Sequence, residues 1–345
     1  MSHRTLKNKG CHKMKKICFL LVFSIVFLFF FSCELQSITT AEVPDSQVIK
    51  TIEFAQPSAS YESEFKKITK KLKEEDKGLF GRELSVYQIV PRKTNEKFDK
   101  NLLRVFEMKD YKVNEKDVRG VINYISDSVF LSIYPRGPFS YFDGKKAMED
   151  GTPFTMSDQE AIQQAKDFLQ SKSLLPEGFI PREKLDISTL ENAVPESETT
   201  PITLAKHVIF ERKIDGYDVV GNSKINISLN RNGIFDVSSF YSDYELYKKI
   251  KCISLEEAIQ RITSSSSTFL YELEKIDGPL EMLTLTEAEI VYHDSSLGEP
   301  ERNTHIQPCY RFTGTVSDGK GNVVAFHALV PALPASETVD NPPLE

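Results

Sequence analysis

Two stretches of this chain begin with nearly the same seven residues, 97 positions apart. They read Ser157-Asp-Gln-Glu-Ala-Ile-Gln163 and Ser254-Leu-Glu-Glu-Ala-Ile-Gln260. In each, the Ser side chain can accept a hydrogen bond from the backbone of the Glu three residues later, and that Glu can reach back to the Ser. This arrangement is the capping box that begins a helix. Apolar residues then recur at helical spacing, so we expect two related helices, each with one face directed into a core.

Segments rich in β-forming residues follow both helices at similar distances. The expected strands are 185–187, 208–210, 217–220, 224–229 and 234–240, and then 288–292, 310–312 and 323–330. A third module precedes them, with a strand at 85–90, a helix at 100–108 and a hairpin at 129–142. One helix packed on an antiparallel sheet, used twice over, predicts the α+β class with tandem helix-on-antiparallel-sheet modules that share one topology.

This interpretation divides the chain into six parts. They are a signal peptide (1–32), a tether (33–58), an N-terminal α+β module (59–150), a first repeat module (151–250), a second repeat module (251–333) and a disordered tail (334–345). The tether lacks sustained periodicity, and the tail is acidic and rich in Pro.

The two repeat modules resemble a known family. Phe210-Glu-Arg-Lys-Ile-Asp-Gly-Tyr217 carries the resemblance best, and Gln307-Pro-Cys-Tyr-Arg-Phe312 and Ala325–Val330 also fit it. The pattern is similar to the PepSY-like modules of extracytoplasmic proteins. The overall layout is similar to the YycH/YycI-type envelope regulators of sensor kinases. The resemblance implies an N-terminal anchor and an α+β ectodomain, and its motifs include no catalytic residue.

The N-terminus has the parts of a secretory signal peptide. A basic flank precedes the apolar run Ile17–Phe31, which as a helix would be about 22 Å long, shorter than a bilayer's hydrocarbon core of about 30 Å. The run ends at Ser32-Cys33 and resembles a lipoprotein signal, in which the Cys thiol takes a lipid before cleavage. We therefore expect Cys33 to be lipidated, with an uncleaved anchor helix as the alternative. Met14 is itself a good start for such a signal. Either way, the chain is expected outside the cytoplasm, anchored to the cell membrane.

Charge argues against nucleic acid as a partner. Residues 1–32 contain six Lys or Arg and no acidic residue, so their removal takes the net charge from −7 to −13. The basic residues of 66–73 are flanked by Glu residues, which is typical of a solvated helix face. A chain this acidic is a poor binder of nucleic acid.

Cys252 and Cys309 are the two thiols left if residues 1–32 are removed and Cys33 is acylated. Both lie in the second repeat module, and the compartment expected for the chain permits disulfides, so they could form one. The alternative is two unpaired thiols that pack as small hydrophobic groups. No Cys/His spacing indicates a metal site.

The sequence shows no established catalytic motif of a hydrolase, and we expect neither catalytic residues nor a cofactor. The histidines outside the signal peptide are interpreted as structural or surface residues: His207, His293, His305 and His327. His305 and Cys309 could make a nucleophile pair, but no orienting Asn or Asp pattern accompanies them. The loop at 318–322 is expected to be a tight hairpin turn rather than a calcium loop.

Two functions remain open. The first is a non-enzymatic envelope lipoprotein that binds a protein partner, as a regulator or an inhibitor of it. The second is an extracytoplasmic hydrolase with an unrecognised active site. Modular surfaces with exposed sheet edges favour the first, and a deep cleft with perturbed titratable groups would favour the second.

Overall fold

The computed structural model describes most of the chain after residue 66. The described residues are 67–90, 92, 94–114, 120–148, 152–190, 202–263, 270–273, 280–294, 304–318 and 320–337. All of them belong to one compact unit of the chain.

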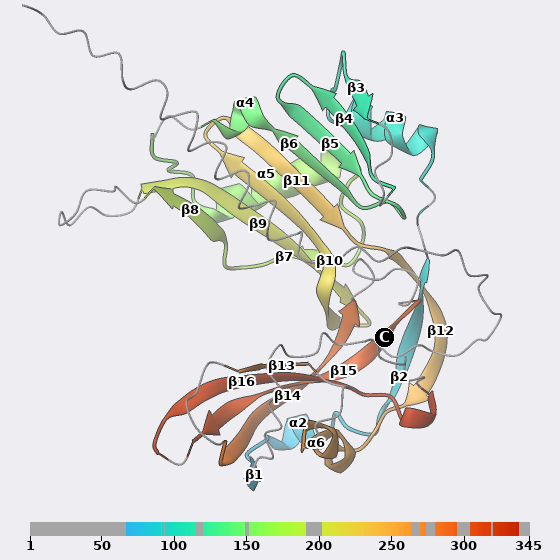
Figure 1. The fold of residues 1–345 in the computed structure, drawn as a ribbon, viewed down its shortest axis with the longest axis vertical. Coiled ribbons are helices and arrows are strands. Elements are labelled where there is room, and N and C mark those ends of the chain that lie inside the picture. The colour runs from blue at the N-terminus through green and yellow to red at the C-terminus, as the bar shows by residue number, and fades with distance from the viewer. Residues whose placement is uncertain are drawn as a thin grey trace, which may run out of the picture. The chain divides into compact units, whose positions relative to one another are not determined.

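Strands dominate this unit (Figure 1). The strands are β1 (Lys67–Lys70), β2 (Glu83–Val90), β3 (Lys112–Asn114), β4 (Ile122–Ser126), β5 (Val129–Ile133), β6 (Phe139–Asp143), β7 (Phe179–Pro181), β8 (Asp186–Leu190), β9 (Ile202–Ile214), β10 (Tyr217–Asn230), β11 (Gly233–Phe240), β12 (Asp243–Lys251), β13 (Leu270–Leu273), β14 (Met282–Asp294), β15 (His305–Ser317) and β16 (Val323–Pro331). The helices are α2 (Glu74–Lys77), α3 (Glu96–Val105), α4 (Gly144–Ala147), α5 (Asp158–Ser171) and α6 (Leu255–Thr263), with a 3-10 turn η1 (Ala335–Glu337).

The 16 strands are joined in one mixed sheet. Its main path runs β12-β2-β15-β14-β10-β11-β6-β5-β4-β3, and the other strands pair beside that path. Most neighbours are antiparallel, but β14 pairs in parallel with β1 and with β10. The second parallel pair joins Asp218–Gly221 to Val291–Asp294, and so links the strands expected in the first repeat module to those expected in the second.

The expected α+β class with tandem helix-on-antiparallel-sheet modules is wrong. The described chain is mostly one large mixed sheet, and its five α-helices are short, from 4 to 14 residues. The sheet includes parallel ladders, and β2 pairs with both β12 and β15 although β2 was assigned to a different module. Capping boxes act over a few residues, so they indicate where a helix begins but say nothing about which strands pair.

The starts of the two repeated helices are confirmed. Ser157 caps α5 with a full capping box, in which its hydroxyl accepts from the Glu160 backbone and Glu160 bonds back to the Ser157 backbone. At α6, the Ser254 hydroxyl accepts from the Glu257 backbone at 3.2 Å, as predicted. The Glu257 side chain also contacts Arg261. Both helices therefore begin where local hydrogen bonding places them.

Two large apolar clusters hold the sheet and its helices together. One gathers α3 and α5 with strands β4, β5, β6, β9, β10 and β11, and the buried faces of these helices include Leu102 and Ala165. The other gathers α6 with β14, β15 and β16, around Ala258 and Phe312. Helices α3, α5 and α6 each pack on the sheet through the residues they contribute to these clusters.

Candidate functional site

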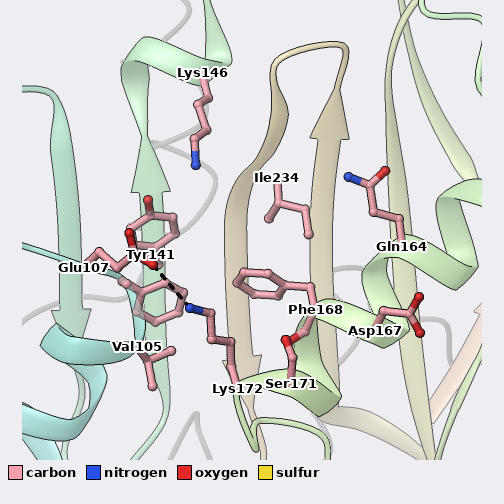
Figure 2. A pocket seen from close by; sticks show the side chains of 11 residues that line it. Val105, Glu107, Tyr141, Lys146, Gln164, Asp167, Phe168, Ser171, Lys172 and Ile234 are labelled. Atoms are coloured by element: carbon pink, nitrogen blue, oxygen red, sulfur yellow. Dashed lines mark hydrogen bonds and ion pairs between the residues drawn. The ribbon is translucent and has the colours of Figure 1, made fainter.

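A groove of about 510 Å³ opens where α3 ends beside β6 and α5 (Figure 2). Its apolar lining residues are Val105, Phe106, Tyr141, Phe168 and Ile234. Its polar and charged lining residues are Glu107, Lys146, Gln164, Asp167, Ser171 and Lys172. The volume lies within the range of about 300–1,000 Å³ that is usual for ligand sites.

Local structure explains how α5 and α3 reach this groove. Residues Ala161, Ala165 and Leu169 bury one face of α5, so the adjacent face presents Gln164 and Phe168 to the groove. Helix α3 ends at Val105, and the chain then adopts a left-handed backbone at Glu107 (φ 55°) and turns away. That turn leaves the last turn of α3 at the groove wall.

Aromatic rings form the floor. The rings of Phe106 and Tyr141 stack with their centroids 4.1 Å apart and their planes 9° from parallel. Phe139 meets Phe106 edge-on at 5.8 Å, and the Phe168 ring centroid lies 6.5 Å from that of Phe106. Such ring contacts add to the stability gained from burying apolar area, so the floor is a packed and preformed surface.

Charged side chains border this floor. In Figure 2, Lys146 and Lys172 point into the groove from opposite sides. The Lys172 Nζ lies 3.5 Å from Glu107 Oε1, and the Lys146 Nζ lies 3.6 Å from Asp143 Oδ2. Burial is the main cause that raises the pKa of Tyr141 to about 12. The Tyr141 hydroxyl therefore stays protonated at neutral pH, and its hydrogen bond with Asp143 is a further cause of the raised pKa.

A second hollow of about 490 Å³ adjoins the first. The two share Phe106, Glu107, Tyr141 and Lys146. The second is more polar, and its further lining residues are Met108, Lys109, Asp110, Ser126, Asp127, Val129 and Asp143. Together they make one groove that is more polar on the side of the second hollow.

The groove offers several kinds of contact to a ligand. Its described lining residues include neither Cys nor His. The groove offers aromatic contact, ionic contact with both signs of charge and hydrogen bonding by Tyr141. Aromatic rings within a polar and charged border are features of a binding surface.

Cys33 lies outside the described residues, as do the expected signal peptide and tether and residues 338–345 of the expected tail. Within the described part of the chain, no helix has both the length and the apolar character needed to cross a bilayer.

Cys252 and Cys309 are both buried free thiols, so the disulfide considered from the sequence is not formed in the structure. Cys252 packs in the α6 cluster with Tyr310, whereas Cys309 packs with Val291 in a separate cluster. Successive residues of a strand point to opposite faces, so Cys309 and Tyr310 face opposite sides of β15. The two thiols therefore lie on different faces. Burial raises the pKa of both, that of Cys252 to about 12.

The four histidines are dispersed over the sheet. His207 Nδ1 lies 2.9 Å from Ser228 Oγ, and burial lowers the pKa of His293 to about 4. His327 is exposed, and His305 Nδ1 lies 2.9 Å from Thr304 Oγ1. His305 and Cys309 stand four residues apart on β15, about 13 Å along an extended strand, so they cannot act as a nucleophile pair.

The 318–322 loop is organised by its first side chain. The Asp318 carboxylate accepts from the backbones of Lys320 at 2.8 Å and Asn322 at 3.2 Å, and from the Asn322 side chain. These bonds are typical of an Asx-type turn. In the described residues, no group of three or more His, Cys, Asp or Glu side chains is arranged to hold a metal ion.

The motif that carries the family resemblance has a structural role here. Asp215 (φ 52°) and Gly216 (φ 83°) form the turn between β9 and β10. The Asp215 carboxylate accepts hydrogen bonds from Ser85 at 2.9 Å and Tyr87 at 2.6 Å, both on β2. Arg212 donates to the Ser242 carbonyl at 2.5 Å. These contacts fix the hairpin against neighbouring strands.

The sequence alone does not indicate the groove. Phe106 lies in the helix expected at 100–108, Phe168 in the helix that begins after Ser157, and Tyr141 in the hairpin expected at 129–142. Their apolar periodicity predicts that they face inward, and it does so equally for a closed core and for a groove wall. Only the meeting of α3, β6 and α5 distinguishes the two.

Comparisons with known proteins give little to compare. No family model matches the chain, and no curated protein matches it. Among solved structures, the chain is similar to a crystal structure of an uncharacterized protein from Eubacterium rectale. The two are 12% identical over 73% of this chain and 84% of that chain, with a TM-score of 0.43.

Proposed function

We propose that this chain is a non-enzymatic, membrane-anchored envelope lipoprotein that binds a protein partner, as a regulator or an inhibitor of it. We further propose that the groove beside Tyr141 receives a segment of that partner. The observation that carries the proposal is the stacked aromatic floor of Phe106 and Tyr141 between charged borders.

The composition of the groove supports a protein ligand. Protein interfaces combine a buried centre rich in aromatic residues with a polar border. Here Phe106, Tyr141 and Phe168 would take an apolar anchor, and Lys172 and Glu107 would meet polar groups around it. The adjoining polar hollow lengthens the surface, as a segment of several residues requires.

The test is site-specific photo-crosslinking in cells. A photoreactive amino acid at Gln164 should capture one partner, because Gln164 lines the groove. Substitution Lys172→Glu in the same chain should reduce the yield at least fivefold, because it places a negative charge beside Glu107. Lys166→Glu changes the same charge on α5 at a position that does not line the groove, and should leave the yield unchanged.

The captured protein should then bind the purified chain directly, with the same ranking of variants. Equal capture by the Lys172→Glu and Lys166→Glu chains would contradict a role for the groove. An absence of any product at Gln164, with the chain present at its normal level, would contradict partner binding there.

One observation favours the alternative of an extracytoplasmic hydrolase. Asp186, His207 and Ser228 are register partners on β8, β9 and β10, and the His207 ring contacts Ser228 Oγ. However, β10 pairs with β9 on one side and β11 on the other, which occupies the backbone N–H groups that could stabilise an oxyanion there.

A fluorophosphonate probe separates the two functions. On the binding proposal, the native chain is not labelled. Labelling that disappears in Ser228→Ala but persists in Ser140→Ala, a serine on the same face, would establish the hydrolase instead.

A further inference from the structure

The chain contains a single Asn-Gly pair, Asn232-Gly233, at the turn where β10 ends and β11 begins. Asn and Gly are favoured in tight hairpin turns because both tolerate unusual backbone angles. The same pair is the one at which an Asn side chain is most readily attacked by the next backbone nitrogen, since Gly has no side chain to block the approach. This turn is therefore a place to look for covalent change.

The surroundings of the pair leave room for that reaction. Asn232 is exposed, and a Cβ built on Gly233 would have no atom within 4 Å. A second turn makes the contrast. Asn322 is also exposed, but it is followed by Val323, whose branched side chain crowds its own backbone nitrogen. Of these two exposed Asn residues, only Asn232 combines an unhindered neighbour with open space around it.

In its unmodified form, the Asn232 amide holds the end of helix α4. Its Nδ2 donates to the carbonyl oxygen of Lys146 at 3.1 Å and to that of Met148 at 2.9 Å. The last carbonyls of a helix lack partners within the helix, so these bonds satisfy acceptors that the helix leaves open. Asn230 Nδ2 also donates to the Lys146 carbonyl, at 2.8 Å. Figure 1 shows α4 beside this end of β10 and β11.

Helix α4 and the hairpin both contribute to the groove. Lys146 of α4 lines it, and so does Ile234, which follows the turn (Figure 2). At the start of α4, Asp143 accepts from the backbones of Lys145 at 3.0 Å and Lys146 at 3.2 Å, and Asp143 lines the second hollow. The Asn232 amide therefore ties the far end of a helix that forms part of the groove wall.

We propose that Asn232 is a site of spontaneous deamidation, and that its products loosen the part of the groove wall formed by α4. The Gly233 backbone nitrogen attacks Asn232 Cγ, so a C–N bond forms between them and the Cγ–Nδ2 bond breaks. The side-chain nitrogen leaves as ammonia and carries away the proton of the Gly233 nitrogen. Water then opens the succinimide ring at either of its carbonyls, which gives Asp or isoaspartate without oxidation or reduction.

Both products reverse what residue 232 presents to α4. A carboxylate has no hydrogen to donate, so the carbonyls of Lys146 and Met148 lose these bonds and face a negative charge. Isoaspartate also adds one carbon to the main chain, which disturbs the tight turn that pairs Asn230 with Gly233. Because Asn230 still holds the Lys146 carbonyl, we expect α4 to become less ordered while the rest of the fold persists.

Peptide mapping of the purified full chain tests the modification. During incubation at pH 8.5, the peptide with Asn232 should convert to Asp and isoaspartate, and more slowly at pH 6, because attack requires the deprotonated nitrogen. Asn322 in the same chain is the internal control and should stay unmodified. Gly233→Ala should slow the conversion at least fivefold. Conversion of Asn232 in guanidinium but not in the native chain would overturn the proposal.

Hydrogen exchange tests the consequence. The backbone amides of Lys145 and Lys146 donate to Asp143, so their exchange reports the order of α4. They should exchange at least fivefold faster in Asn232→Asp than in the wild type. Asn322→Asp adds the same charge at another exposed turn and should exchange like the wild type. Equal exchange in the two variants would overturn the link between residue 232 and α4.

Neither measurement requires a bound partner. Weaker capture of a partner by the Asn232→Asp chain is a further expectation, and it rests on the proposed function of the groove. If the groove captured no partner, mapping and hydrogen exchange would still decide whether Asn232 deamidates and whether α4 loosens.

Discussion

Gly221 on β10 packs its α-carbon directly against the carbonyl of Asp294 on β14, at the last register pair of the parallel ladder that joins these strands. A side chain on Gly221 would overlap that carbonyl oxygen, and the backbone there is left-handed (φ 99°). Glycine is therefore required at this position for two independent reasons, steric and conformational.

Gly221→Ala should lower the free energy of unfolding by about 2 kcal/mol or more, measured by urea denaturation. The matched control is Gly233→Ala, since Gly233 has a similar φ of 100° but open space around its α-carbon. Gly233→Ala should lower the free energy of unfolding by about 1 kcal/mol, because Ala is strained in the left-handed backbone conformation but meets no neighbouring atom. Equal losses in the two variants would show that the close approach to Asp294 does not matter.

Tyr124→Phe should destabilise the α3 end of the sheet. The Tyr124 hydroxyl donates at 2.7 Å to Asp99, whose carboxyl is buried, so the variant leaves a buried acceptor without this donor. We expect a loss of about 1–3 kcal/mol in urea unfolding. Tyr111→Phe changes a neighbouring but exposed tyrosine and should cost less than about 0.5 kcal/mol. A Tyr124→Phe chain as stable as the Tyr111→Phe chain would contradict the argument.

Asp236 should make stability depend on pH. Burial raises the pKa of this partly buried carboxyl from 3.8 to about 7. Between about pH 4 and 7 the folded state keeps a proton that the unfolded chain has lost, so the contribution of Asp236 to the free energy of unfolding falls as pH rises. Asp236→Asn removes this contribution. The stability of the variant relative to the wild type should therefore increase from pH 4 to 7 and then level off.

Urea denaturation at several pH values measures that difference. Asp110 is exposed, so the variant Asp110→Asn serves as the control for the loss of one carboxylate from the chain. A wild-type minus Asp236→Asn difference that is flat across this range would show that Asp236 is ionised throughout.

Cys252 and Cys309 should be unreactive in the folded chain. Burial raises the pKa of both thiols and excludes the reagent. Iodoacetamide at pH 8, followed by peptide mapping, should label neither in the native protein and both in guanidinium. Mapping without reduction should find each as a separate peptide, whereas a linked pair of peptides would establish the disulfide.

Cys33→Ala should abolish lipid attachment. Metabolic labelling with palmitate should mark the wild-type chain and the Cys18→Ala chain, in which the altered residue lies within the expected signal peptide. The Cys33→Ala chain should be unlabelled and unprocessed, because attachment of the lipid to the Cys33 thiol comes before cleavage at that residue. Unchanged labelling and processing in this variant would reject the lipoprotein interpretation and favour an uncleaved anchor.

Local elements of this fold could be predicted because their causes are local. The cap of α5 needs only Ser157 and Glu160, three residues apart, and the β10–β11 hairpin turn needs only Asn232-Gly233. The alternation along β10 likewise identifies Ile225 and Ile227 as one face without any knowledge of the partner strand. The expected modules are wrong because they depend on which strands pair with one another, and neighbouring residues do not specify those pairs.

The sequence by itself determined the caps, most of the strands and the acidic character of the chain, since each depends on neighbouring residues or on composition. Only the tertiary structure decided that β14 lies parallel to β10 and that Cys252 and Cys309 pack on opposite sides of β15. It also decided that Phe106, Tyr141 and Phe168 form the floor of a groove. These relationships join residues far apart in the chain. They are selected by the free energy of the whole packed sheet, for which a short stretch of sequence carries no separate signal.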